Sequence, residues 1–155
     1  MSELEREITE ALDSICRKLN RGDVGNFQAS LGLFSTQNVP EHAEEETVKR
    51  IFGASTKPVF FMLSSFEEMT SQFRDCIGWK GDYGAHPNRK YHPTQECSED
   101  IAQVLEKLKV LFGEAKEFWE FSIEQGHPYY PVFWDFAFLI KGTAKTYVFI
   151  GSSSD

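Results

Sequence analysis

The side chains best suited to chemistry in this sequence lie in one stretch, residues 79–97, which reads WKGDYGAHPNRKYHPTQEC. The stretch follows neither the period of a helix nor that of a strand, and it mixes glycine, proline, aromatic and basic residues. Loops longer than about 12–15 residues are uncommon, and they are usually functional or disordered. The aromatic residues argue against disorder, since disordered segments contain few of them. We therefore expect this loop to be the working surface of the protein.

The composition of the loop indicates binding rather than catalysis. An arginine such as Arg89 can clamp a carboxylate or a phosphate through two parallel hydrogen bonds. Aromatic rings can stack on a ligand or anchor an interface. The alternative is a structural loop whose aromatic residues plug a satellite core. The binding residues that we predict in the loop are Trp79, Tyr83, His86, Arg89, Lys90, Tyr91 and His92.

Metal binding and thiol catalysis fit the loop poorly. His86, His92 and Cys97 have the spacing H-x5-H-x4-C, which matches no compact zinc pattern and supplies only three ligands. Cys97 could act as a nucleophile near a helix N-terminus, with a histidine as its base. The neighbouring acidic residues Glu96 and Glu99 oppose this, because they raise the pKa of a thiol. We predict no metal, no cofactor and no catalytic residue, and we expect Cys97 to be an exposed, unreactive thiol.

Two residues outside the loop complete the candidate site. Asp135 interrupts the apolar run VFWDFAF, and strand alternation places it on the face of Ala137. We expect this carboxylate to be buried and therefore paired or hydrogen-bonded, with a structural role favoured over an acid–base role. His127 stands at the start of the C-terminal hairpin. A deep pocket formed by the loop, Asp135 and His127 would make the protein a small enzyme or a small-ligand receptor.

The elements that must position these residues follow from hydrophobic periodicity and capping patterns. Ser2 and Glu5 form a capping box before a helix whose apolar residues recur at helical spacing up to Leu19. Ser65 and Glu68 repeat that pattern. The other elements that we predict are a strand at 27–33, a loop at 35–40, a helix at 41–52, a buried strand at 59–63, a helix at 65–77, a long helix at 98–125 capped by Ser98, strands at 132–140 and 146–150, and a polar tail at 151–155.

This order of elements predicts an α+β protein with one globular domain over residues 1–155. We expect a mixed or antiparallel sheet of about four strands, with about four helices packed on it and a C-terminal β-hairpin. A chain of 155 residues is long enough to bury a core without a disulfide or a metal.

Charge and cysteine content narrow the partners and the compartment. The chain has 16 basic and 24 acidic residues, and its net charge of −8 argues against nucleic-acid binding and suits a basic protein partner. The three cysteines form no CxxC pair, which indicates a reducing compartment. No signal peptide opens the sequence, and the longest apolar run is too short to cross a membrane. We expect a cytoplasmic protein.

These observations favour a non-enzymatic binding protein. An antitoxin- or immunity-type protein that neutralises a basic effector is one concrete version of this hypothesis. The alternative is the small enzyme or ligand-binding protein described above. A third hypothesis is a homo-oligomer that pairs through an exposed edge strand.

Overall fold

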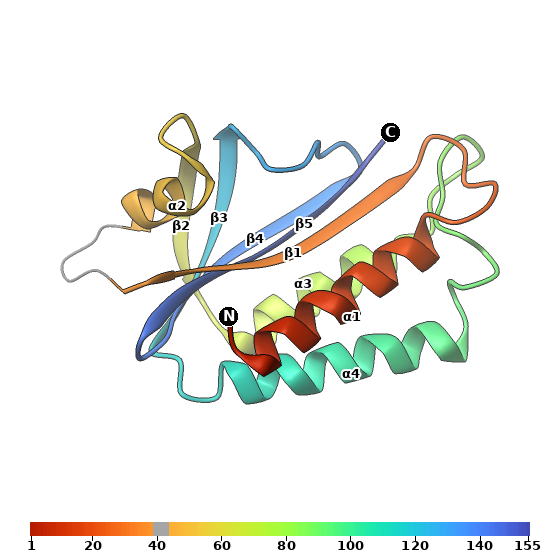
Figure 1. Cartoon of the computed structure of the whole chain (residues 1–155). Coiled ribbons are helices and arrows are strands. Elements are labelled where there is room, and N and C mark those ends of the chain that lie inside the picture. Colours follow the sequence, from red (N-terminus) through yellow and green to blue (C-terminus); the bar gives the residue numbers. More distant parts are fainter. Residues whose placement is uncertain (39–43) are drawn as a thin grey trace.

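A computed structural model describes residues 1–38 and 44–155 of the chain as an α+β fold. Three helices cover one face of an antiparallel sheet (Figure 1). The elements are α1 (Glu3–Leu19), β1 (Gln28–Gln37), α2 (Glu44–Phe52), β2 (Lys57–Ser64), α3 (Phe66–Ile77), α4 (Gln95–Leu111), β3 (Glu117–Gln125), β4 (Trp134–Lys141) and β5 (Lys145–Ser154).

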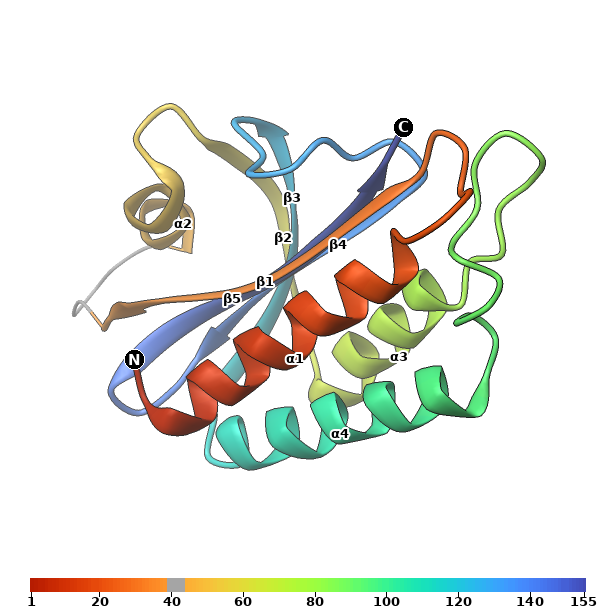
Figure 2. The same ribbon diagram turned by 45° about the vertical axis from the view of Figure 1, so that its right-hand side comes forward.

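The five strands form one sheet in the order β1-β5-β4-β3-β2, and every neighbouring pair is antiparallel. Adjacent strands β4 and β5 form the predicted C-terminal hairpin. Strands β1 and β2 follow each other in the sequence, with α2 between them, but they lie at opposite edges of the sheet. Figure 2 shows α1, α3 and α4 side by side under the sheet and α2 apart from them.

The core has two parts because the sheet is covered on both faces. The larger part lies between the sheet and the three helices, and its largest fully buried side chains are Phe73, Phe138 and Phe149. The smaller part lies on the α2 face and centres on Val48 and Leu139. No helix among the described residues is long and apolar enough to span a membrane.

The first helix confirms its predicted capping box. Ser2 Oγ accepts a hydrogen bond from the Glu5 amide at 3.2 Å, and the Glu5 carboxylate accepts one from the Ser2 amide at 2.7 Å. The apolar stripe is buried from Ile8 to Leu19, and Leu4 at its start is half-buried. At α3, the Ser65 side chain caps the helix through the Glu68 amide, as predicted.

The predicted long helix at 98–125 is wrong at both ends. The helix begins at Gln95, because the Thr94 hydroxyl rather than that of Ser98 caps it by accepting a hydrogen bond from the Cys97 amide. It ends at Leu111, just before Gly113, and residues 117–125 form β3. The apolar residues on both sides of the break keep helical spacing by coincidence, which conceals the alternating strand pattern that follows.

Three other element predictions need correction, and one, the helix at 41–52, is present where the structure describes it. Residues 35–37, predicted as loop, extend β1. The tail at 151–155 is largely strand, since β5 continues to Ser154 and Ser153 is completely buried. The helix predicted at 41–52 is present from Glu44, and its first three residues lie outside the described part of the chain. The strand predicted at 59–63 exists as β2, but three of its five apolar side chains are exposed rather than buried.

Candidate functional site

The loop predicted as the working surface is held in one conformation by the segment that joins α1 to β1. The Asn88 amide donates to the Leu19 carbonyl at 2.8 Å, and the His86 amide donates to the Val24 carbonyl at 3.2 Å. Gly25 has φ +62°, and a Cβ there would lie 2.2 Å from the Gly84 carbonyl oxygen. Only glycine allows this close backbone approach, so the loop and the connection after α1 form one ordered unit.

The aromatic residues of the loop divide between structure and surface. Trp79 is half-buried and stacks between Phe27 and Phe133, with ring centroids 5.9 and 4.9 Å apart. Its ring therefore supports the fold, as expected of a structural loop. Tyr83, by contrast, is fully exposed at the tip of the loop.

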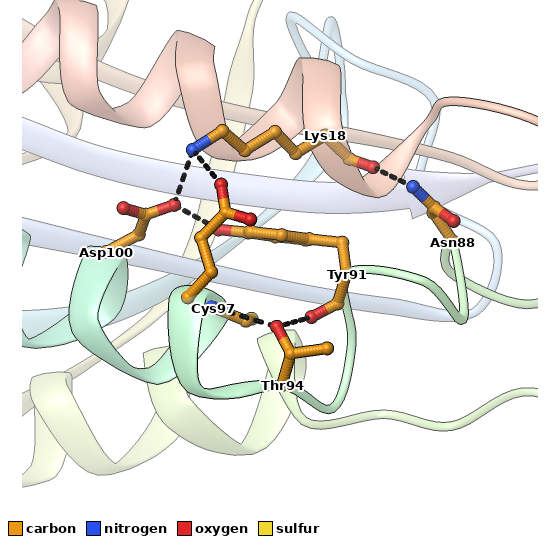
Figure 3. A network of polar contacts seen from close by, with 7 residues as sticks. Lys18, Asn88, Tyr91, Thr94, Cys97 and Asp100 are labelled. Carbon is orange, nitrogen blue, oxygen red and sulfur yellow. Dashed lines mark hydrogen bonds and ion pairs between the residues drawn. The ribbon is translucent and has the colours of Figure 1, made fainter.

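Tyr91 is buried in a polar network that joins α1 to α4 (Figure 3). Its hydroxyl donates to Asp100 Oδ2 at 2.8 Å, and the Lys18 ammonium lies 2.8 Å from the same carboxylate oxygen and 2.8 Å from Glu96. Burial, followed by the hydrogen bond to Asp100, raises the pKa of Tyr91. Every polar group of this side chain is occupied, so Tyr91 serves the fold rather than a ligand.

Cys97 and His92 are also buried, at the start of α4 and just before it. The prediction of an exposed Cys97 is wrong, because helix α4 begins two residues before it and turns the thiol inward. Burial raises the pKa of Cys97, with smaller effects from Asp100 and Glu96 in the same direction, which makes the thiol a poor nucleophile. Burial lowers the pKa of His92. Among residues 1–38 and 44–155, no three histidine, cysteine or acidic side chains gather as metal ligands would.

His86, Arg89 and Lys90, the other predicted binding residues of the loop, line a pocket where the end of α1 meets the loop. We call it the loop pocket. His86 is half-buried, whereas Arg89 and Lys90 are exposed. The loop pocket has a volume of about 450 Å³, and its lining residues are Arg21, Gly22, Asp23, His86, Asn88, Arg89 and Lys90.

Neither Asp135 nor His127 lines the loop pocket. Asp135 is exposed, contrary to expectation, because it is the second residue of β4 and the apolar cluster on its face begins only at Ala137. His127 is half-buried, and its Nδ1 accepts a hydrogen bond from the Tyr129 amide at 2.9 Å. Burial lowers the pKa of His127, and the nearby Asp135 carboxylate opposes that shift. These two residues are neighbours, but they lie apart from the basic part of the loop.

A surface that the sequence did not single out lies on edge strand β2. Three of its apolar side chains face solvent: Phe60 is 80% exposed, Met62 59% and Leu63 67%. We call these three residues the β2 patch. A continuous apolar run is typical of a buried strand, which explains the wrong prediction. Pro58 was the available signal, because proline within a sheet is confined to edge strands, strand starts and bulges.

A β-bulge shapes the β2 patch. Val59 pairs with Ser122 and Met62 with Glu120, so Phe60 and Phe61 together face a single residue of β3. Phe61 turns inward and stacks on Phe121 at 5.1 Å. Phe60 adopts φ +59°, a conformation that favours glycine, and its ring projects into solvent.

The other edge of the sheet is capped at one residue near the start of β1. The side-chain amide of Asn20, at the end of α1, accepts from the Ala29 amide at 2.7 Å and donates to the Ala29 carbonyl at 3.0 Å. Asn20 thereby makes the two hydrogen bonds that a neighbouring strand would make. The end of helix α1 thus occupies the backbone groups of Ala29 that another chain could otherwise pair with.

Comparison with known proteins gives a fold and no family. No known protein family matches the chain, and no curated protein matches its sequence. Among solved structures, the fold is similar to that of citrus MAF1, with a TM-score of 0.52. The likeness covers 93% of this chain and 98% of that one, at 13% sequence identity. At this identity the likeness shows a shared arrangement of helices and strands.

Proposed function

We propose that this protein is a non-enzymatic binding protein that holds an apolar, basic segment of another protein at its β2 patch. The observation that carries the proposal is Phe60, a large aromatic residue that is strained, bulged and exposed at once. Strained non-glycine conformations cluster at functional sites. The three exposed apolar side chains lie on an edge strand, whose free side is open to another chain.

The β2 patch offers side chains that act as anchors in interfaces. Aromatic residues and methionine are enriched where partners bury each other's surface. Full burial of a side chain such as Phe60, Met62 or Leu63 contributes about 1.5–3 kcal/mol. In the isolated chain these three side chains gain little of that energy, since all are more than half exposed. A partner that covers them would gain it.

Acidic residues next to the β2 patch favour a basic partner. Glu120 lies opposite Met62 in the sheet, and Glu67 and Glu68 occupy the first turn of α3, directly after β2. The cation in β2, Lys57, is paired with Glu124 at 2.8 Å. Complementary charge speeds association and selects partners. The net charge of −8 for the whole chain acts in the same direction.

The form of the β2 edge favours a specific partner over indiscriminate strand pairing. Pro58 and the bulge at Phe60 interrupt the row of backbone groups that a second sheet would need. A regular homo-oligomer built by edge pairing is therefore a weaker hypothesis than recognition through the three exposed side chains. Neutralisation of a basic effector, as by an antitoxin- or immunity-type protein, is one form that this binding would take.

The test is a pull-down from extracts of the protein's own cells, with quantitative mass spectrometry as the readout. The double variant M62D/L63D should lose any specific partner, because two charges at the anchor positions oppose desolvation. Binding of that partner to the parent protein should weaken as salt is raised, because the acidic surround contributes to it. Sedimentation of the purified protein gives its own oligomeric state.

A matched control is V110D, which places a charge at an apolar position that is 71% exposed on α4. This variant should keep the partner. Equal recovery of the partner with M62D/L63D and the parent protein would overturn the proposal, as would equal loss with V110D.

A further inference from the structure

We infer that the loop pocket is a binding site for a small phosphomonoester. This site is separate from the β2 patch and involves different elements. Three cationic side chains line it, Arg21, Arg89 and Lys90, against the single carboxylate of Asp23. Such a local excess of positive charge is notable in a chain whose net charge is −8.

The three cations are available to a ligand. In the described part of the chain, seven other basic side chains are held in ion pairs with carboxylates, but Arg21, Arg89 and Lys90 are in none. Arg89 makes one long hydrogen bond, at 3.4 Å, to the Asp82 carbonyl. An unpaired guanidinium retains the planar donors that bind phosphate through two parallel hydrogen bonds.

The walls of the loop pocket are fixed before any ligand arrives. Asn88 uses both ends of its side-chain amide internally: Nδ2 donates to the Lys18 carbonyl at 3.0 Å, and Oδ1 accepts from the Lys90 amide at 3.0 Å. With its backbone amide on Leu19, Asn88 occupies two carbonyls at the end of α1. Those carbonyls form the negative end of the helix dipole, which would otherwise disfavour an anion. Preorganised sites bind more tightly because less ordering is needed.

His86 adds a further polar group to the loop pocket. Its Nδ1 lies 2.9 Å from the Pro87 carbonyl oxygen, which can only accept, so Nδ1 carries the proton. The remaining ring nitrogen, Nε2, makes no hydrogen bond within the described part of the chain. The volume of about 450 Å³ is within the range of small-ligand sites, about 300–1,000 Å³, and exceeds what a bare phosphate needs. A phosphate group with a small organic substituent fits both the charge and the space.

Calorimetric titration of the purified protein at low ionic strength tests the inference, with phosphoserine, serine and inorganic phosphate as probes. Phosphoserine should bind, serine should not, and inorganic phosphate should bind more weakly. R21A and R89A should each weaken phosphoserine binding by about tenfold or more, since a hydrogen bond to a charged group contributes about 1.5–3 kcal/mol.

The matched control is R74A, which removes another unpaired, exposed arginine from α3 and changes the net charge equally. R74A should leave phosphoserine binding unchanged. M62D/L63D should also leave it unchanged, so that failure of the β2 patch proposal and failure of this inference can be told apart. Equal weakening by R74A would reduce the effect to overall charge and overturn the site. Equal affinity for inorganic phosphate and phosphoserine would overturn the phosphomonoester assignment.

Discussion

At the scale of single residues, Phe60 allows a direct test of strain. A left-handed conformation costs a non-glycine residue about 1–2 kcal/mol, and Phe60 has φ +59°. Glycine adopts this conformation freely, whereas alanine remains strained. We therefore expect F60G to be more stable than F60A by about 1 kcal/mol in urea unfolding. Because the ring is 80% exposed, F60A itself should differ little from the parent protein.

The outcome separates strain from packing. If F60A were destabilised by about 3 kcal/mol, as for a buried phenylalanine, the ring would be packed in solution and the β2 patch would not exist as described. If F60G and F60A were equally stable, the bulge would not hold a strained residue.

The sequence could identify residues of the right chemistry, but not their exposure. Arg89, Lys90 and Tyr83 were predicted as surface residues of the loop and are exposed, whereas Tyr91 and His92 in the same loop are buried. The difference arises from contacts with α1 and α4, which are distant in sequence. Asp135 was predicted to be buried and is exposed. Strand alternation assigned it to the face of Ala137, but it could not show that the apolar cluster on that face begins only at Ala137.

At the scale of elements, the protection of β1 by α1 should be measurable. Asn20 supplies two hydrogen bonds to Ala29, and each contributes about 0.5–1.5 kcal/mol. N20A should therefore lower the free energy of unfolding by about 1–3 kcal/mol, and hydrogen exchange at the Ala29 amide should accelerate. R17A, an exposed change on the same helix, should stay within about 0.5 kcal/mol of the parent protein. Unchanged exchange at Ala29 in N20A would show that Asn20 does not cover the edge.

Elements with local signals were predictable, and those defined by distant partners were not. The capping box at Ser2 and the hairpin of β4 and β5 are determined by nearby residues, and both are confirmed. Strand β3 was predicted as helix because its identity depends on pairing with β2 and β4. The serines near the C-terminus look like a tail, yet they are buried because β5 lies between β1 and β4.

At the scale of the whole molecule, charge is distributed unevenly and gives the two proposed sites opposite preferences. The β2 patch lies beside Glu67, Glu68 and Glu120, while the loop pocket gathers Arg21 and Arg89. The net charge of the chain predicted a basic partner. It could not reveal that the loop pocket is lined mainly by basic side chains. A single number for the chain averages over surfaces that act independently.

The stability of the whole molecule should fall in two steps as the pH is lowered. Burial lowers the folded-state pKa of His92 and His127 below the usual 6.5, so the unfolded state binds more protons in the window just under pH 6.5. The free energy of unfolding therefore decreases as the pH falls through that window. Although burial alone would raise the pKa of Glu5, hydrogen bonds from Ser2 and Lys145 lower it below 4.5, and the stability from this carboxylate is lost at still lower pH.

Urea unfolding at pH values from about 3 to about 8, monitored by tryptophan fluorescence, checks both steps. This pH range includes the reference pKa values of glutamate and histidine. H92Q should reduce the upper step and leave the lower one, because it removes a group that must stay neutral in the folded state. E5Q should do the reverse, because it removes a carboxylate that the fold keeps ionised. A rise in stability as the pH falls from about 6.5 would contradict this account, since it would mean that the folded state binds more protons than the unfolded state in that window.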